Sequence, residues 1–406
     1  MQTTPRADRK QLRVYLAAIA IFGVMGGLYD TTFNNYLKHS FGISDQARSN
    51  LELPREMPGF LVTLVAGSLA GLALNRVGGV SMALASAGLA GLAFAHGNLA
   101  TMIGFLVVFS TGVHLNIPTG SSITLALARE GKKATLLGKA GAAGILGTVA
   151  GAVFVAFVMK PLGFAFRGVY IIGALCAIAA AALVFSVGRV EGHSEKRRKV
   201  FVFKRRYTRY YVLSALYGAR KQVFMTFGPW VLVKVFKQPE QTMAKLSIAY
   251  CVVGLVVQPA VGRLIDRLGE RTMLVAEGLV LMCVCVTYAV AGAWPASGAA
   301  LSAIMTVYVV DQLCFSVSMA RTTYLAKIVE SPEDLSGGLA SGVSIDHLAS
   351  MSLPMLGGLV WEAFGFRYVF WGASAIAVAM AAVSFGIRTP ERTGPGAAAA
   401  PGKAAE

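Results

Sequence analysis

Polar residues interrupt this chain at regular intervals, and between them lie long, almost continuous apolar runs. Each run has about 18 to 27 residues, which is enough for a tilted helix across roughly 30 Å of hydrocarbon. The pattern predicts an all-α integral membrane protein with twelve transmembrane helices. We place them near residues 14–37, 53–74, 80–97, 101–127, 136–159, 168–188, 211–235, 244–265, 272–292, 299–325, 336–361 and 368–387.

The longest polar interruption divides the runs into two sets of six. It contains nine Lys and Arg residues: Arg189, Lys196, Arg197, Arg198, Lys199, Lys204, Arg205, Arg206 and Arg209. This break predicts an N-terminal six-helix bundle in 1–188, a basic linker in 189–210 and a C-terminal bundle in 211–388. The last residues, 389–406, are mostly Pro, Gly and Ala, which favours a disordered tail.

The distribution of positive charge predicts the orientation of the chain in its membrane. Most Lys and Arg outside the runs fall on the side of the linker, and such residues resist translocation. We therefore expect the linker and both termini to be cytoplasmic, in a multi-pass protein of a bacterial inner (plasma) membrane. The net charge of +17 lies in loops between runs. It is explained by topology and by attraction to anionic lipid, and it does not indicate nucleic-acid binding.

Composition and motifs argue against other classes of protein. A mean hydropathy of +0.62 with 14% charged residues is typical of membrane proteins. All five cysteines lie inside apolar runs, which predicts buried thiols and no disulfide framework. No Walker motif, zinc-protease motif or catalytic Ser/His/Asp set occurs in an exposed segment. We therefore expect no enzyme activity, no cofactor and no resident metal.

Two short segments recur in both halves of the chain. Gly71–Gly78 follows the second run, and the similar Gly262–Gly269 follows the eighth, 191 residues later. Phe166–Tyr170 opens the sixth run, and Phe366–Phe370 opens the twelfth, 200 residues later. Because both pairs fall at corresponding places, the halves are predicted to be structural repeats.

These repeats resemble the major facilitator superfamily, whose signature loop reads G-x-x-x-D-R-x-G-R-R. The second copy keeps Gly262, Asp266, Arg267, Gly269 and Arg271, with Glu270 where a base is usual. In the first copy Asn75 replaces the acid, and we expect it to cap the helix that follows. The resemblance implies two pseudo-symmetric six-helix bundles, with the first, fourth, seventh and tenth helices lining a central cavity. It also implies a gating role for Asn75, Arg76, Asp266 and Arg267.

Charged and imidazole side chains inside the runs are the strongest functional signal. Burying such a group in a membrane costs several kcal/mol unless it faces a cavity or a partner. Those near mid-membrane are His114, Arg220, Lys221, Asp311, Asp346 and His347, and Asp30 lies somewhat outward in the first run. They lie on the helices that the resemblance places beside the cavity or next to it, so we expect them to share one aqueous chamber.

From these residues we predict two sets of contacts. Substrate contacts are expected from Asp30, Asn34, His114, Asn116, Tyr217, Arg220, Lys221 and Gln312. Proton-coupling groups are expected to be Asp30, Asp311, Asp346 and His347.

Several structural alternatives stay open. Arg220 forms an ion pair with Asp30 or Asp311, Asp30 makes only a structural hydrogen bond, or His114 and Asn116 form a polar core pair. A transition-metal site is a further alternative, made by His114 with Asp346 and His347.

Arg55 and Glu56 stand at the predicted outer end of the second run, beside Pro54 and Pro58. They are candidates for an extracellular gate, and the alternative is a cap at the membrane interface.

Together these features predict a secondary active transporter that works by alternating access between two bundles. Protons are the expected coupling ion, and Arg220 and Lys221 favour a small organic anion as the solute. The alternatives are a drug-like or cationic solute moved by efflux, a transition-metal ion, or a receptor that transports nothing. Expected partners are the solute, protons and membrane lipid, around a monomer. The pattern leaves the direction of transport open.

Overall fold

The structure is a computed structural model that describes residues 9–65, 72–95, 97–128, 132–190, 202–291, 293–294 and 297–387. Half of the predicted linker, residues 191–201, and the whole predicted tail lie outside these residues. The described part is helical, with no strand.

The helices follow one another with short connections. They are α1 (Arg9–Tyr36), η1 (Leu37–Phe41), α2 (Asp45–Asn50), α3 (Glu52–Val65), α4 (Leu74–Phe94), α5 (Leu99–Leu127), α6 (Lys133–Val153), η2 (Phe154–Val158), α7 (Phe166–Ser186), η3 (Arg205–Tyr207), α8 (Thr208–Trp230), η4 (Val231–Val235), α9 (Glu240–Ala291), α10 (Gly298–Cys314), η5 (Phe315–Val317), α11 (Ser318–Ile328), α12 (Pro332–Phe364) and α13 (Phe366–Phe385).

Nine helices of the described part are long and apolar enough to cross a membrane. One of them, α9, has 52 residues and bends at Gly269, whose φ of 79° and ψ of 161° are not helical, so it makes two crossings. Two more helices, α3 and α8, cross as well but do not meet these requirements of length and apolarity. The described part of α3 is short because residues 66–71 lie outside the described residues, and α8 is rich in polar residues. The predicted twelve-helix membrane fold is therefore confirmed.

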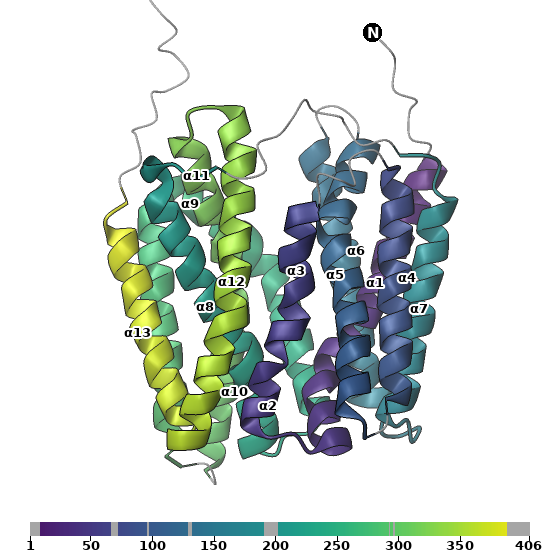
Figure 1. Ribbon diagram of the computed structural model, residues 1–406, viewed down its shortest axis with the longest axis horizontal. Helices are drawn as coiled ribbons and strands as arrows, with labels where there is room; N and C mark the ends of the chain where they lie inside the picture. Colours follow the sequence, from purple (N-terminus) through teal and green to yellow (C-terminus); the bar gives the residue numbers. More distant parts are fainter. Residues whose placement is uncertain are drawn as a thin grey trace, which may run out of the picture.

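The helices pack in two groups, which we call the first and second bundles. In the first, α1 packs on α6 and α7, and α4 packs on α5 and α7. In the second, α9 packs on α10 and α13, and α8 packs on α12. Figure 1 shows α1 and α3 to α7 on the right and α8, α9 and α11 to α13 on the left. The start of α1 and the end of α13 lie at the same end of the bundles, which we call the linker end; the opposite end is the distal end (Figure 1).

Glycines allow α1 and α6 to approach closely. An added Cβ at Gly147 would overlap the backbone carbonyl of Ala20, and one at Gly151 would overlap that of Val24. From the other side, a Cβ at Gly27 would overlap the carbonyl of Thr148. These G-x-x-x-G faces therefore bring two backbones into contact, as small residues do between helices in lipid.

The second crossing begins earlier than its hydrophobic run predicts. Its first turn starts at Asp45 in place of residue 53, and Ser44 caps it, because the Ser44 hydroxyl accepts a hydrogen bond from the Ala47 amide at 3.1 Å. Glu56 therefore lies eleven residues beyond the start of α2, or about 16 Å along the helix at 1.5 Å per residue. A gate and a cap at the membrane interface both stay predictions for Arg55 and Glu56.

The two signature loops make contacts within their own bundles. The helix after the first loop is capped by Ala73 without a side-chain bond, so the expected cap by Asn75 was wrong. The Asn75 amide instead donates to the Val187 carbonyl at 3.0 Å and accepts from the Val190 amide at 3.2 Å. In the second loop, Glu270 forms an ion pair with Lys327 at 2.6 Å.

Candidate functional site

The two bundles touch through residues at and near the distal end. Trp230 Nε1 donates to Asp45 Oδ1 at 2.6 Å, and Lys38 Nζ donates to the Val233 carbonyl at 2.6 Å. The backbone amide of Gln46 donates to Glu362 Oε1 at 3.1 Å. Between described residues, no hydrogen bond or ion pair joins the bundles closer to the linker end than Glu56 and His347. The distal end is thus closed by polar contacts.

A chamber of about 140 Å³ lies between the bundles on the linker side of these contacts. Helices from both bundles contribute to it: α1, α2, α3, α8, α9 and α10. Its lining residues are Tyr29, Asp30, Phe33, Asn34, Arg48, Arg55, Phe224, Met225, Pro229, Tyr250, Tyr308 and Gln312. Three predicted substrate contacts, Asp30, Asn34 and Gln312, therefore face the same space.

Asp30 is the acid of this chamber. Its side chain is exposed to the chamber, and none of the described basic residues forms an ion pair with it. The nearest guanidinium in the lining, that of Arg55, is bound to Glu52 at 2.6 Å and to Glu56 at 3.2 Å. Asp30 is thus a carboxylate at membrane depth whose charge no partner neutralises directly.

One wall of the chamber is a buried charge network on the second crossing. Glu52 is fully buried and binds Arg48 at 2.5 Å and Arg55 at 2.6 Å. It also accepts a hydrogen bond from Gln222 of the second bundle at 2.5 Å. Arg48 in turn donates to Asn34 at 2.9 Å. The network therefore bonds this wall of the chamber to α1 of the first bundle and to α8 of the second.

The two basic residues of α8 are neutralised inside the second bundle. Arg220 binds Asp311 at 2.5 Å, and both side chains are almost completely buried. Lys221 binds Asp346 at 2.8 Å and is partly exposed. Of the alternatives for Arg220, the ion pair with Asp311 is the one found. Arg220 and Lys221 do not line the chamber in this structure.

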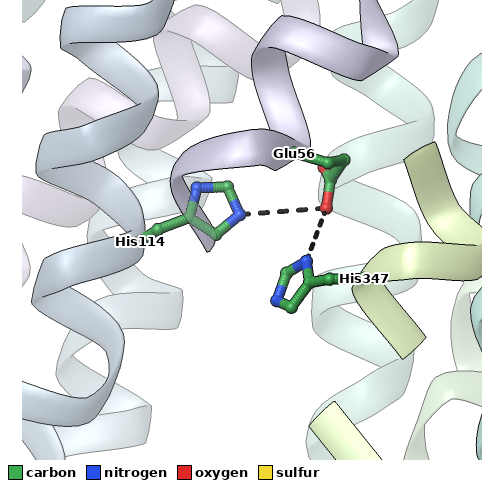
Figure 2. Close-up of side chains that lie close together, drawn as sticks. All are labelled: Glu56, His114 and His347. Carbon is green, nitrogen blue, oxygen red and sulfur yellow. Dashed lines mark hydrogen bonds and ion pairs between the residues drawn. The ribbon is translucent and has the colours of Figure 1, made fainter. Parts of the chain in front are cut away.

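A third polar cluster joins α3, α5 and α12. Glu56 Oε2 lies 3.2 Å from His347 Nδ1 and 3.9 Å from His114 Nε2 (Figure 2). His114 and His347 therefore meet Glu56 and each other, whereas Asp346 turns toward Lys221. A proton-coupling role for Asp311, Asp346 and His347 stays a prediction.

The remaining candidate residues lie outside the chamber lining. Asn116 accepts a hydrogen bond from Ser81 at 3.3 Å, within the first bundle. Tyr217 is buried beneath the Arg321 guanidinium, which stands 3.4 Å from its ring centre. At the linker end, Arg76, Asp266 and Arg267 are exposed. A gating role for these loop residues and for Asn75 stays a prediction.

Sequence reasoning did not identify Arg48, Glu52 or Gln222. A signal was present, because Arg48, Glu52 and Arg55 are spaced four and three residues apart, which places opposite charges on one helical face. It was overlooked because the hydrophobic run was taken to begin at residue 53. The aromatic residues of the lining carry no such signal, since aromatic residues in membrane helices usually face lipid or the bundle core.

Solved structures with the same architecture are transporters. The nucleoside transporter NupG matches with a TM-score of 0.75 and 13% identity, over 94% of this chain and 100% of its own. A bacterial homologue of the iron transporter ferroportin, in an inward-facing state, matches with a TM-score of 0.73 and 15% identity, over 92% and 98%. A D-xylose–proton symporter matches with a TM-score of 0.70 and 14% identity, over 94% and 97%. At these identities the likeness shows the fold alone.

Among curated proteins, none matches the sequence significantly. The family model for the Major Facilitator Superfamily matches residues 15–344 and 210–405, which together span almost the whole chain. The two bundles, the chamber between them and the signature loop Gly262–Arg271 agree with this match. The chain therefore belongs to the major facilitator superfamily, and it is a multi-pass secondary transporter that works by alternating access rather than an enzyme.

Proposed function

We propose that this transporter uses a proton gradient to move a small polar organic solute through the chamber between its bundles. The observation that carries the proposal is Asp30, an acid exposed to a chamber that both bundles line and without an ion-pair partner among the described residues. A carboxylate in that position can take up a proton from one side of the membrane and release it on the other. Transport driven in this way takes its energy from the proton gradient and does not require an ATPase domain.

The lining favours a small solute that carries a planar ring. Five aromatic side chains contribute flat surfaces: Tyr29, Phe33, Phe224, Tyr250 and Tyr308. Asn34 and Gln312 add amide groups that select for hydrogen-bonding partners. Drug-sized ligands occupy pockets of roughly 300–1,000 Å³, and a chamber of about 140 Å³ is smaller. We therefore place a ring-bearing polar solute, such as a nucleobase derivative, ahead of a multidrug substrate.

A small organic anion is the second candidate. Arg48 and Arg55 line the chamber, and a guanidinium binds a carboxylate through two parallel hydrogen bonds. Against it, Glu52 already binds both guanidiniums, and Arg220 and Lys221 are paired with Asp311 and Asp346. An anion would therefore have to compete with Glu52 for its partners.

We also propose that the linker end is cytoplasmic, in a bacterial inner membrane, and that the chain works as a monomer. The excess of Lys and Arg on that side supports this orientation. Because the polar contacts between bundles gather toward the distal end, the structure then corresponds to an inward-facing state.

Flux measurements in proteoliposomes test this function. With an imposed pH gradient, we expect wild-type protein to accumulate at least one member of a panel of labelled nucleobases, nucleosides and small organic acids. Asp30→Asn, which cannot release a proton, is expected to keep solute counterflow and lose gradient-driven accumulation. Asp30→Glu is the matched variant and should keep part of the accumulation. Accumulation by Asp30→Asn equal to that of wild type would exclude Asp30 as the coupling group.

A further inference from the structure

The cluster of Glu56, His114 and His347 has the composition of a transition-metal site. One ligand atom from each residue lies within 4.8 Å of the other two. Figure 2 shows the Glu56 carboxylate between the two imidazoles, each reaching it from a different helix. Two imidazole nitrogens and one carboxylate oxygen form a donor set that suits zinc and its neighbours in the first transition row.

The distances are close to those that a bound ion requires. Zinc bonds of about 2.0–2.2 Å in tetrahedral geometry place ligand atoms roughly 3.4 Å apart. The separations from Glu56 Oε2 are 3.2 Å to His347 Nδ1 and 3.9 Å to His114 Nε2, on either side of that value. All three ligand atoms lie within 4.8 Å of one another, so rotation of the two imidazoles has to shorten the longer separations around one ion.

The surrounding residues hold the ligands in orientations suited to binding. His114 Nδ1 lies 2.9 Å from the Ser110 carbonyl, an acceptor that requires the proton on Nδ1 and so leaves the Nε2 lone pair facing Glu56. Such a hydrogen bond to the second ring nitrogen is typical of histidine ligands. The Arg55 guanidinium lies 3.2 Å from the other oxygen of Glu56, Oε1, as an ion pair, which leaves Oε2 to the histidines.

A glycine provides the space in which the two imidazoles meet. A Cβ at Gly59 would stand 2.5 Å from His114 Cδ2 and 2.6 Å from His347 Cε1. Any larger residue at this position would push the rings away from Glu56. The ligands are also shielded but reachable, with 15% of the His114 side chain and 13% of the His347 side chain exposed.

We propose that Glu56, His114 and His347 bind one divalent transition-metal ion such as Zn²⁺ and leave a fourth position for water. Glu56 and His114 belong to the first bundle and His347 to the second, so a bound ion ties the bundles together. Because these residues lie on the linker side of the contacts that close the distal end, the ion adds a further tie to the distally closed state and restrains alternating access. The site depends only on these contacts, and not on the solute or on the coupling proton of the proposed function.

Metal titration of the full-length purified protein tests the site. The protein is freed of its purification tag, stripped with a chelator, treated with a thiol-blocking reagent and titrated with Zn²⁺ by calorimetry. We expect saturation at one ion per chain and a melting temperature that rises with Zn²⁺ concentration. Mg²⁺ and Ca²⁺, which prefer oxygen ligands, should bring neither change.

Variants assign the ligands. His347→Gln and His114→Gln should each weaken Zn²⁺ binding by more than about tenfold. His39→Gln changes an exposed histidine outside the cluster and should bind as wild type does. The visible spectrum of Co²⁺-loaded wild type reports imidazole and carboxylate ligation without relying on any variant. Absence of saturable binding to wild type, or binding by both histidine variants as tight as that of wild type, would refute the site.

Thiol labelling tests the bridge between bundles. In a Gln46→Cys protein, at the distal contact, Zn²⁺ should slow reaction with a maleimide, and a chelator should restore the rate. Adding His347→Gln should abolish the protection. Protection that persists in this double variant would show that the ion does not act through the cluster.

Discussion

At the scale of single residues, the structure replaces isolated membrane charges with pairs. Seven ionisable groups were predicted from sequence to lie inside the membrane helices. Six of them have a partner of opposite charge or an adjacent carboxylate in the structure, and the seventh, Asp30, forms no ion pair with a described residue. The cost of an unpaired membrane charge makes such pairing expected in general. The choice of partner is set by helix rotation, which the hydrophobic pattern does not fix.

The pair of Arg220 and Asp311 yields a stability prediction. Removing one member leaves the other as an uncompensated buried charge, so Arg220→Met alone should destabilise the protein by about 3–5 kcal/mol. Arg220→Met combined with Asp311→Leu should recover most of that loss, because neither charge of the pair is left without the other. Thermal unfolding of the three proteins in detergent measures both effects. A double variant no more stable than Arg220→Met would contradict the pairing account.

At the scale of helices, the hydrophobic pattern predicted nearly every crossing but misplaced some ends. The second crossing was the largest error, since its first turns, Asp45 to Glu56, carry charges that lower the local hydropathy. These charges form the Arg48–Glu52–Arg55 network, so the error in the helix boundary hid part of the site. Functional charges thus weaken the signal by which membrane helices are found.

Helix packing in the first bundle gives a matched pair of substitutions. Gly147→Ala places a methyl group against the Ala20 carbonyl, so it should separate α1 from α6 and lower the melting temperature. Gly141→Ala lies on the same helix with no atom near its added Cβ, and should leave the melting temperature unchanged or raise it slightly. Equal melting temperatures for the two variants would argue against close contact between these helices.

Ion pairs join the end of the predicted linker to residues at the start of α12. Lys204 binds Glu330 at 2.6 Å and Asp334 at 2.5 Å, at the linker end. The hydrogen bond from Lys204 holds the pKa of Glu330 below its ordinary value of 4.5. The lowered pKa of Glu330 means that its carboxylate stabilises the folded protein above pH 4.5. This contribution is lost as the pH falls through the pKa of Glu330 in the folded protein.

We therefore expect the contact between Lys204 and Glu330 to persist at neutral pH and to weaken only below pH 4.5. Hydrogen exchange of the first turns of α12, corrected for intrinsic rates, should rise in that range in wild type. Glu330→Gln should show the higher exchange already at neutral pH. A transition centred above pH 4.5 would point to another group.

At the scale of the whole molecule, the sequence predicted two related bundles but not which of their residues contact each other. The same hydrophobic runs serve every state of an alternating-access cycle, so the pattern carries no information on which end is closed. The structure supplies this through Trp230 and Asp45, Lys38 and Val233, and Gln46 and Glu362. Each contact joins residues nearly 200 or more positions apart.

The central claim is a chamber between the bundles that is reached from the linker end and closed at the distal end. Gln312 lines this chamber, so Gln312→Cys places a thiol inside it. Its reaction with a membrane-impermeant maleimide can be followed in inside-out and right-side-out vesicles, with the wild-type protein as background. The account predicts fast labelling from the linker face and slow labelling from the distal face. Equal rates from both faces, or faster labelling from the distal face, would contradict it.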